Sequence, residues 1–264
     1  MDAAAEVYEK TGLRGRLSYS TMDEVGLPES IAGNAKQAVA ETDRLYSAWD
    51  GKGNLKVYYS LRALNSCSDE LTEPAATHAK ERSAVLQAHM NEYQGEVDGI
   101  LNREGMRPYE YLEKMGVLSS KFLGAHSLLL SEKEKELVEQ YGVRLCHCPF
   151  SNCGKAVPDT PDLVSRGIIP GFGSDGAAAI DEEESCGRIE VGYQVDLIGI
   201  ELSAGRLIPS GNLLHTMFEC AESGDVRDVI VGGKVLMQDR EVKVLDEEQI
   251  RFKATEYMKK EGVL

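Results

Sequence analysis

The stretch FLGAHSLLLSEKEKELVEQYGVRLCHC, residues 122–148, has the pattern of a strand, a helix and a second strand. Its two ends are short and largely apolar, which is typical of buried strands. Between them, Ser131 is followed three residues later by Glu134, which is a capping box, and Gly142 is a residue that commonly ends a helix. A helix that joins two buried strands predicts a parallel pair.

The same alternation of strand and helix patterns covers roughly the first 180 residues. Ligand-type residues follow several of these strands, and sites built from many strand ends are typical of the upper rim of a (β/α) barrel. The strands begin about 30 residues apart, which is nearly the repeat of a closed eight-unit barrel and also suits an open doubly wound sheet. The six expected strands are residues 17–20, 55–60, 85–89, 122–126, 143–148 and 168–172, and the ligand-type residues are Arg62, His89, His126 and Asp175.

The remainder of the chain has a different pattern. Residues 186–200 predict two short strands about a turn, and residues 226–237 predict a hairpin with two glycines at its turn. A last helix is expected over residues 246–260. This part therefore predicts a small β region that ends in a helix.

Together these patterns predict an α/β protein with two domains. Residues 1–182 are expected to form an incomplete (β/α) TIM-type barrel with about six of its eight units, and residues 183–264 a small β-sandwich-like appendage. Pro170 lies in the sixth strand and should weaken it. The uncovered edges of such a sheet favour self-association into a homo-oligomer.

The charge balance excludes several partners. Lys and Arg number 29 against 44 Asp and Glu, which gives a formal net charge of −15. Nucleic acid and anionic membrane surfaces both require clustered basic residues, so neither is expected to bind. With no signal-peptide pattern at its start and six cysteines in 264 residues, the chain is expected in the cytoplasm with reduced thiols.

Three short motifs contain residues suited to metal-assisted hydrolysis. His89 ends a strand and Glu92 follows in the next loop, a spacing that suits a metal ligand and a separate acid–base group. Asp175 lies between small residues after the sixth strand, and His126 ends the fourth. Each motif has a structural explanation too: a helix-start carboxylate, an Asp-Gly turn and a hydrogen-bonded core histidine.

The remaining histidines and the cysteines suggest less. Cys146 and Cys148 flank His147, but a structural zinc site normally pairs two Cys/His clusters and the second is absent from the sequence. Strand alternation also turns His147 away from both cysteines. His78 and His215 are expected at the surface.

In their order along the chain, the motifs resemble the amidohydrolase superfamily, specifically its cytosolic aminohydrolase branch, which includes guanine deaminase, the methylthioadenosine/S-adenosylhomocysteine deaminases and the triazine hydrolases. The tail, with Val-Asp-Leu and the Gly-Gly hairpin, is similar too. The resemblance runs from about residue 5 to the C-terminus. The motifs are His89-Met-Asn-Glu92, Leu123-Gly-Ala-His126, His147-Cys-Pro-Phe-Ser-Asn152 and Gly173-Ser-Asp175-Gly.

The resemblance implies a role for each residue. His89 and Asp175 would ligate one divalent metal ion, with zinc expected first and iron as the alternative. Asp175 would also take a proton from the attacking water, and Glu92 would deliver one to a ring nitrogen of a small heterocyclic substrate. His126 would hold the attacked group. Arg62 and Asn65 follow a strand on the same rim and are expected to contact the substrate.

The chain departs from the family pattern at the metal. The family takes two further ligands from a His-x-His pair, and none of the five histidines forms such a pair. Two alternatives therefore remain open: a metal-dependent hydrolase of C–N bonds, or a catalytically inactive relative that acts in binding or is an incomplete gene product. A metal-free α/β protein of another family is a third.

Overall fold

The computed structural model describes most of the chain, and the described part separates into two compact units. The described residues are 1–23, 33–152, 155–156, 158–173, 187–208 and 211–262. Unit 1 consists of residues 1–2, 16–51 and 56–181, and unit 2 of residues 3–15, 52–55 and 182–264.

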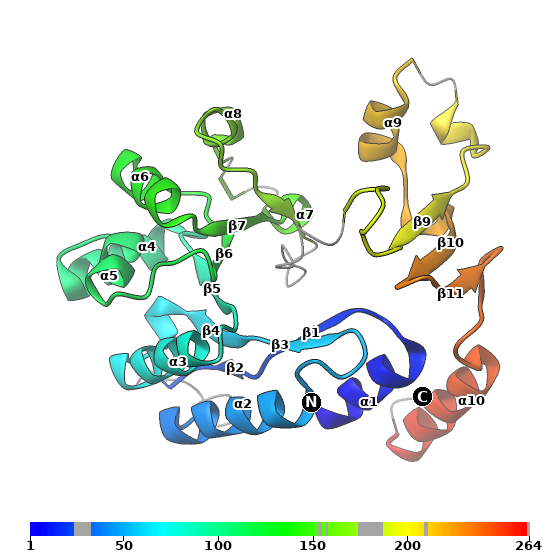
Figure 1. The fold of residues 1–264 in the computed structure, drawn as a ribbon, viewed down its shortest axis with the longest axis horizontal. Helices are drawn as coiled ribbons and strands as arrows, with labels where there is room; N and C mark the ends of the chain where they lie inside the picture. The colour runs from blue at the N-terminus through cyan, green and yellow to red at the C-terminus, as the bar shows by residue number, and fades with distance from the viewer. Residues whose placement is uncertain (24–32, 153–154, 157, 174–186, 209–210, 263–264) are drawn as a thin grey trace. The chain divides into compact units, whose positions relative to one another are not determined.

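A parallel six-stranded sheet forms the centre of unit 1 (Figure 1). The strands lie in the sheet in the order in which they occur along the chain, β2-β4-β5-β6-β7-β8, and every pairing is parallel. The carboxyl ends of the strands therefore meet at one edge, where the residues that follow them gather. The strands are β2 (Ser20–Thr21), β4 (Tyr59–Ala63), β5 (Leu86–Met90), β6 (Phe122–His126), β7 (Arg144–His147) and β8 (Gly171–Phe172).

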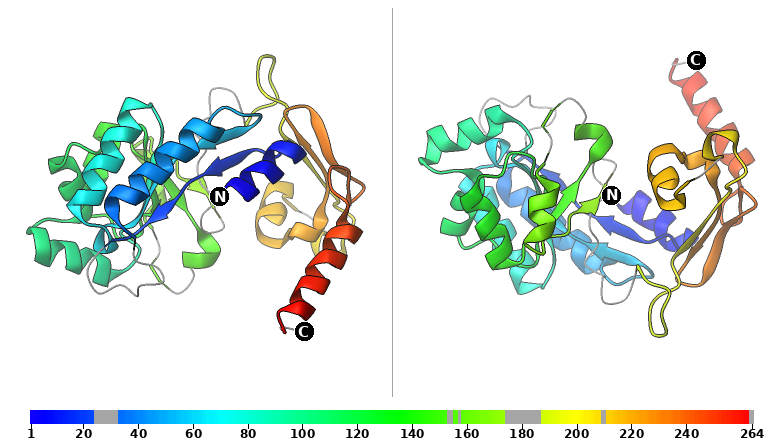
Figure 2. Two further views of the ribbon diagram at one scale, coloured as in Figure 1. Left: turned by 90° about the horizontal axis from the view of Figure 1, so that it is seen from below. Right: turned by 90° about the horizontal axis from the view of Figure 1, so that it is seen from above.

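Helices α3 to α6 lie on one side of this sheet, as Figures 1 and 2 show from different directions. The capping box of Ser131 and Glu134 is present, and Gly142 ends α6 in the left-handed conformation, with φ +62°. Both sequence predictions for that helix are confirmed. The helices of unit 1 are α2 (Ala35–Trp49), α3 (Asp69–Glu81), α4 (Gln94–Glu104), α5 (Pro108–Lys114), α6 (Glu132–Tyr141) and the short α7 (Pro149–Asn152) and α8 (Thr160–Ser165), with the 3₁₀ turn η1 (Leu64–Ser66).

Two hydrophobic clusters lie on opposite faces of the sheet. In β6, Phe122 belongs to the large cluster that the helices cover, whereas Leu123 belongs to a small one on the other face. This separation follows from the two-residue period of a strand. The small cluster also contains Cys146 and Cys148, which are both buried and are not in disulfides. Both faces of the sheet therefore contain buried side chains, which is usual for parallel sheets.

The sixth strand is shorter than the sequence predicts. β8 contains two residues and begins directly after Pro170. Proline has no N–H for the ladder, so the sheet pairs only beyond it. The expected strand at residues 17–20 is also divided, between β1 (Gly15–Leu17), which pairs with β3 (Leu55–Val57) in a separate two-stranded sheet, and β2.

Unit 2 contains an antiparallel sheet of four strands in the order β12-β11-β10-β9. Gly232 and Gly233 form the predicted hairpin turn. Their φ angles of +56° and +78° are left-handed values, which glycine adopts readily. The elements are α1 (Asp2–Thr11), β9 (Leu197–Ile200), β10 (Val226–Val231), β11 (Lys234–Gln238), β12 (Glu241–Val242), α9 (Leu213–Cys220) and α10 (Glu247–Lys260), with the 3₁₀ turns η2 (Gly205–Leu207) and η3 (Ser223–Asp225).

One strand predicted for this unit is absent. Described residues 187–196 form bends and turns, and only β9 remains of the two strands expected over 186–200. Ile189 and Val191 suggested the missing strand by their alternation, but their side chains are 91% and 103% exposed. Alternating hydrophobic and polar residues form a strand only where a neighbouring strand can pair with them and one face can be buried.

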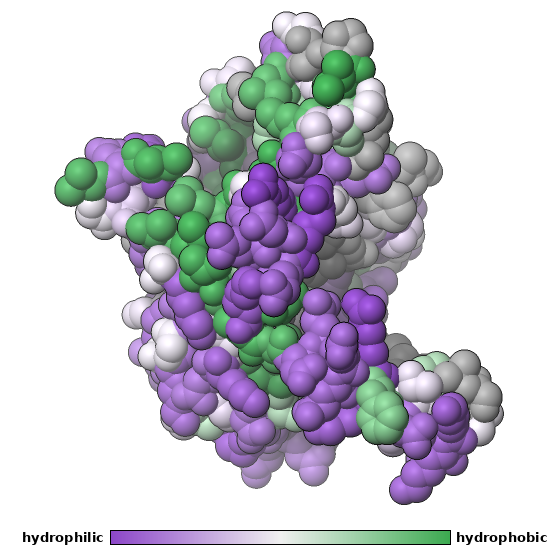
Figure 3. Space-filling view, turned by 90° about the vertical axis from the view of Figure 1, so that its right-hand side faces the viewer, coloured by the Kyte–Doolittle hydropathy of each residue, from purple (hydrophilic) through white to green (hydrophobic). Residues whose placement is uncertain are grey.

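Hydrophobic side chains on the surface are more common in unit 2. Ile198 of β9 is 61% exposed, and the described part of α10 has no buried residue. In the view of Figure 3, hydrophobic side chains lie at the surface among polar ones. Among the described helices of the chain, none has both the length and the hydropathy that crossing a bilayer requires.

Candidate functional site at the carboxyl ends of the strands

His89 is held by a backbone group of the neighbouring strand. It lies in β5, and its Nδ1 hydrogen-bonds the backbone carbonyl oxygen of Arg62 in β4. Burial lowers the pKa of His89, an effect that the Arg62 carbonyl opposes. A neutral imidazole fixed through Nδ1 presents Nε2, which is the arrangement typical of a metal-binding histidine.

His126 of β6 lies beside it. The two rings stack with centroids 5.3 Å apart and planes 23° from parallel. His126 is 3% exposed, and its Nε2 lies 3.6 Å from Oε2 of Glu92. The adjacent, parallel strands β5 and β6 thus bring together three residues that the sequence predicts as functional.

Asn152 connects two histidines at this edge. It is 4% exposed, and its Oδ1 is 2.9 Å from Nδ1 of His126. Its Nδ2 is 3.0 Å from Nδ1 of His147. Burial lowers the pKa of His147, and an electrostatic interaction with His126 acts in the same direction. Asn152 ends the His147-Cys-Pro-Phe-Ser-Asn152 motif, but no periodicity in the sequence indicates that its amide joins two rings.

Lys155 is a further charged residue at the site. Its Nζ forms an ion pair with Oε1 of Glu92 and lies 4.9 Å from the centroid of the Tyr93 ring. The hydrogen bond to Glu92 raises the pKa of Lys155. Sequence analysis missed this residue because 63 positions separate the two partners.

Two buried carboxylates support the loop after β5. Oε1 and Oε2 of Glu96 accept the backbone N–H groups of Asn91 and Glu92, at 3.2 and 3.0 Å. Burial raises the pKa of Glu96 to about 7, although these hydrogen bonds act in the opposite direction. Glu134, the capping-box residue, accepts a hydrogen bond from the Asn91 side chain at 3.0 Å and from Nε of Arg107 at 2.7 Å. The loop that contains Glu92 is thus anchored to α4 and α6.

The backbone at the site is left-handed at three residues other than glycine. The φ angles are +48° at Asn91, +67° at His126 and +50° at Ser127. Asn and His tolerate this region better than most residues, whereas Ser is less usual there. Hydrogen bonds hold the geometry, since Ser127 N donates to the carbonyl oxygen of Met90 at 2.8 Å.

The remaining predicted site residues are Arg62, Asn65 and Asp175. Arg62 and Asn65 both have exposed side chains, near the carboxyl end of β4. The contact that Arg62 makes with the site is through its carbonyl group, and a substrate contact by either side chain stays a prediction. Asp175 lies outside the described residues. In the part of the chain that the structure describes, no group of three or more His, Cys, Asp or Glu side chains could hold a metal ion.

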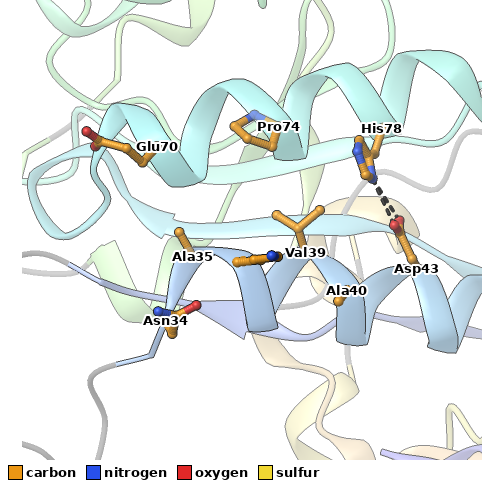
Figure 4. Close-up of a pocket in the computed structure, with 9 residues that line it drawn as sticks. Asn34, Ala35, Val39, Ala40, Asp43, Glu70, Pro74 and His78 are labelled. Atoms are coloured by element: carbon orange, nitrogen blue, oxygen red, sulfur yellow. Dashed lines mark hydrogen bonds and ion pairs between the residues drawn. The ribbon is translucent and has the colours of Figure 1, made fainter.

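A separate cavity of about 470 Å³ lies between α2 and α3 (Figure 4). At one end His78 Nδ1 pairs with Oδ2 of Asp43 at 2.9 Å, and Asp43 also accepts the hydroxyl of Tyr59. The side chain of His78, which the sequence predicts at the surface, is 34% exposed, and its pair with Asp43 joins the two helices. The cavity is lined by Asn34, Ala35, Lys36, Val39, Ala40, Asp43, Glu70, Pro74 and His78.

Comparison with known proteins identifies relatives of this chain. The chain is 28% identical to the 5′-deoxyadenosine deaminase of Methanopyrus kandleri, over 97% of this chain and 69% of that protein. It is 27% identical to the 5-methylthioadenosine/S-adenosylhomocysteine deaminase of Aquifex aeolicus, over 98% and 70%. Among solved structures, a zinc-bound adenosine deaminase from Xanthomonas campestris matches with a TM-score of 0.86 at 22% identity, covering 100% of this chain and 70% of that one.

The family match covers the whole of unit 1. Residues 1–186 match the amidohydrolase family, and the deaminase relatives extend the match over nearly the whole chain. The resemblance inferred from His89, His126 and the neighbouring motifs is thereby confirmed. This chain, which spans about 70% of the length of those relatives, belongs to the amidohydrolase family.

Proposed function

We propose that this protein hydrolyses a C–N bond in a nucleobase-like heterocycle, releasing ammonia or an amine. The observation that supports this most directly is the packing of His89, His126 and Glu92 at the ends of two adjacent parallel strands. The names of the relatives favour a purine nucleoside over a triazine as the substrate. The proposal includes a barrel of about six of eight units over residues 1–182 and a small β appendage over 183–264.

His89 and Asp175 are the proposed ligands of one divalent ion, zinc or iron. The fit at His89 is good, because the Arg62 carbonyl fixes Nδ1 and leaves Nε2 to face an ion. Such an ion supplies Lewis acidity, which makes water a usable nucleophile near neutral pH. Asp175 would take the proton from that water.

Glu92 and His126 act on the substrate in this proposal. Glu92 in its protonated form would deliver a proton to the ring nitrogen next to the attacked carbon, while His126 would hold the group on which negative charge develops. The amine would leave with the proton that Asp175 took from water, and Glu92 would regain its proton from the new hydroxyl group. Lys155 holds the Glu92 carboxylate through Oε1, so Oε2 is the oxygen that faces His126 and the reacting atoms. Arg62 and Asn65 would contact the substrate at the rim.

A catalytically inactive relative that acts in binding is the second candidate. It is supported by the histidine count, because none of the five histidines forms the His-x-His pair that the family uses for two further ligands. A catalytic zinc site normally has at least three protein ligands, so fewer would weaken metal binding by orders of magnitude.

Metal content and turnover distinguish the two candidates. The full chain is purified after metal-replete expression, dialysed and analysed for zinc and iron. Ammonia release is then measured with 5′-deoxyadenosine, 5′-methylthioadenosine and guanine. About one ion per chain together with ammonia release supports the enzyme. Metal that dialysis removes, with no ammonia from any substrate, refutes it and favours the inactive relative.

Two variants assign the roles. His89→Ala should lose the metal, whereas Glu92→Gln should keep the metal and lose turnover by at least about 100-fold, since it removes the proton donor. Glu136→Gln, on the exposed face of α6, is the matched control for the second change. Unchanged metal in His89→Ala would place the ion elsewhere and refute the proposed ligand set.

A further inference from the structure

The side-chain amide of Asn152 contacts two histidines in chemically different ways. Oδ1 lies 2.9 Å from Nδ1 of His126, and Nδ2 lies 3.0 Å from Nδ1 of His147. The residue is 4% exposed and ends the short helix α7, where its backbone N–H donates to the carbonyl oxygen of Cys148 at 2.8 Å. Burial and this backbone bond limit where the amide can lie.

An amide has one acceptor end and one donor end, so it cannot serve both rings in the same way. The ring that meets Oδ1 must have a hydrogen on Nδ1. The ring that meets Nδ2 must have a lone pair on Nδ1, which places the hydrogen of a neutral imidazole on Nε2. Turning the amide over would exchange the two requirements, and the rings would still differ.

We propose that Asn152 is a positioning residue that gives the two histidines opposite tautomers, with the hydrogen of His126 on Nδ1 and that of His147 on Nε2. Nε2 of His126, 3.6 Å from Oε2 of Glu92, then has a lone pair, and it can donate to the attacked group only after it binds a second proton. The value of this arrangement for catalysis rests on the proposed function, but the tautomers themselves do not depend on it.

Nitrogen-15 NMR of the full chain with labelled histidine tests the proposal without metal or substrate. The spectra are recorded near pH 8, on the alkaline side of the ordinary histidine pKa. Ring signals are assigned from His126→Gln and His147→Gln, each of which removes one set. We expect a protonated-type Nδ1 for His126 and a protonated-type Nε2 for His147. The same tautomer on both rings, or the reverse assignment, would overturn the proposal.

Asn152→Asp gives a sharper test, because a carboxylate has two acceptor oxygens and no donor. His147 should then move its hydrogen from Nε2 to Nδ1, while His126 keeps its own on Nδ1. Asn102→Asp, at an exposed position of α4, adds the same charge and should change neither ring. If the His147 signals are the same in Asn152→Asp as in the wild type, the amide does not set the tautomer.

A second readout separates this proposal from the proposed function. If the metal-loaded protein turns over, Asn152→Asp should lower kcat with little change in KM, since the change acts through His126 and not through substrate contacts. If the protein has no deaminase activity, the NMR spectra still test the tautomers. Wild-type spectra still test whether the two tautomers are opposite even if the variant fails to fold, a state that the fluorescence of Trp49 would reveal.

Discussion

Units 1 and 2 of this chain bury their hydrophobic residues to very different extents. In unit 1 a continuous core joins the helices to one face of the parallel sheet. In the described part of unit 2, the buried hydrophobic residues are only Ala5, Leu55, Leu207 and Leu236. Because hydrophobic burial is the main favourable contribution to folding, unit 1 should be the more stable unit. The candidate site therefore lies on the more stable part of the molecule.

The largest expected effect is on the core of unit 1. Leu61, in the middle of β4, is 0% exposed, and Leu61→Ala should lower the free energy of unfolding by about 3–5 kcal/mol. Leu236→Ala in unit 2 should cost about 2 kcal/mol, because fewer atoms surround the cavity that it leaves. Urea unfolding followed by Trp49, the single tryptophan, reports on unit 1, and hydrogen exchange reports on unit 2. Equal losses would contradict the difference between the units.

The next effect is a pH dependence confined to unit 1. The pKa of Glu96 is about 7 in the folded protein against an ordinary value of 4.5. The folded state thus holds a proton that the unfolded state has released, so stability falls by roughly 3 kcal/mol as the pH rises from 4.5 to about 7. Glu96→Gln should remove this dependence from the unfolding of unit 1. Glu136→Gln, an exposed control, should retain it. A slope that persists in Glu96→Gln would assign the proton to another group.

A smaller effect concerns the close packing of β6 against α5. A Cβ atom on Gly124 would collide with the hydroxyl oxygen of Tyr109, so Gly124→Ala should cost about 2 kcal/mol. Combining it with Tyr109→Phe should recover part of this cost, because the colliding oxygen is gone. Gly99→Ala in α4, where a Cβ meets nothing within 4 Å, should be neutral or slightly stabilising. Strictly additive losses in the double variant would exclude the collision.

The smallest effect is in unit 2, where few hydrophobic residues are buried and an ion pair adds to the stability. Nε and a terminal guanidinium nitrogen of Arg14 bind Asp196 at 2.6 and 3.0 Å, and Asp196 also accepts the backbone N–H of Gly232 at 2.7 Å. Arg14→Met should cost about 1.5 kcal/mol, measured by hydrogen exchange in the β10–β11 hairpin. Arg227→Met removes the exposed pair with Asp239 and should cost less than about 0.5 kcal/mol. If both variants lose the same stability, burial is not what makes the Arg14 pair stronger.

Local features of the fold could be predicted from the sequence. The capping box at Ser131, the glycine pair of the hairpin and the strand that contains His89 each depend on a few neighbouring residues, and all are present. Prediction failed at Ile189 and Val191, where local alternation had no partner strand. Helices α7, α8 and α9 were not predicted.

The site was predictable in part for the same reason. Strand ends indicated where His89 and His126 would meet, because adjacent parallel strands end at the same edge. The Arg62 carbonyl and the Lys155 ammonium were not predictable, since one contact uses the backbone and the other joins distant segments. The proposed role of Asp175 stays a prediction.

The left-handed backbone at Asn91, His126 and Ser127 affects which residues evolution would retain at these positions. Each such residue costs on the order of 1–3 kcal/mol that the surrounding hydrogen bonds must offset. A population selected only for heat resistance would gain by admitting glycine at these positions, and the imidazole would be among the groups lost. Selection for stability alone would therefore favour glycine over histidine at position 126.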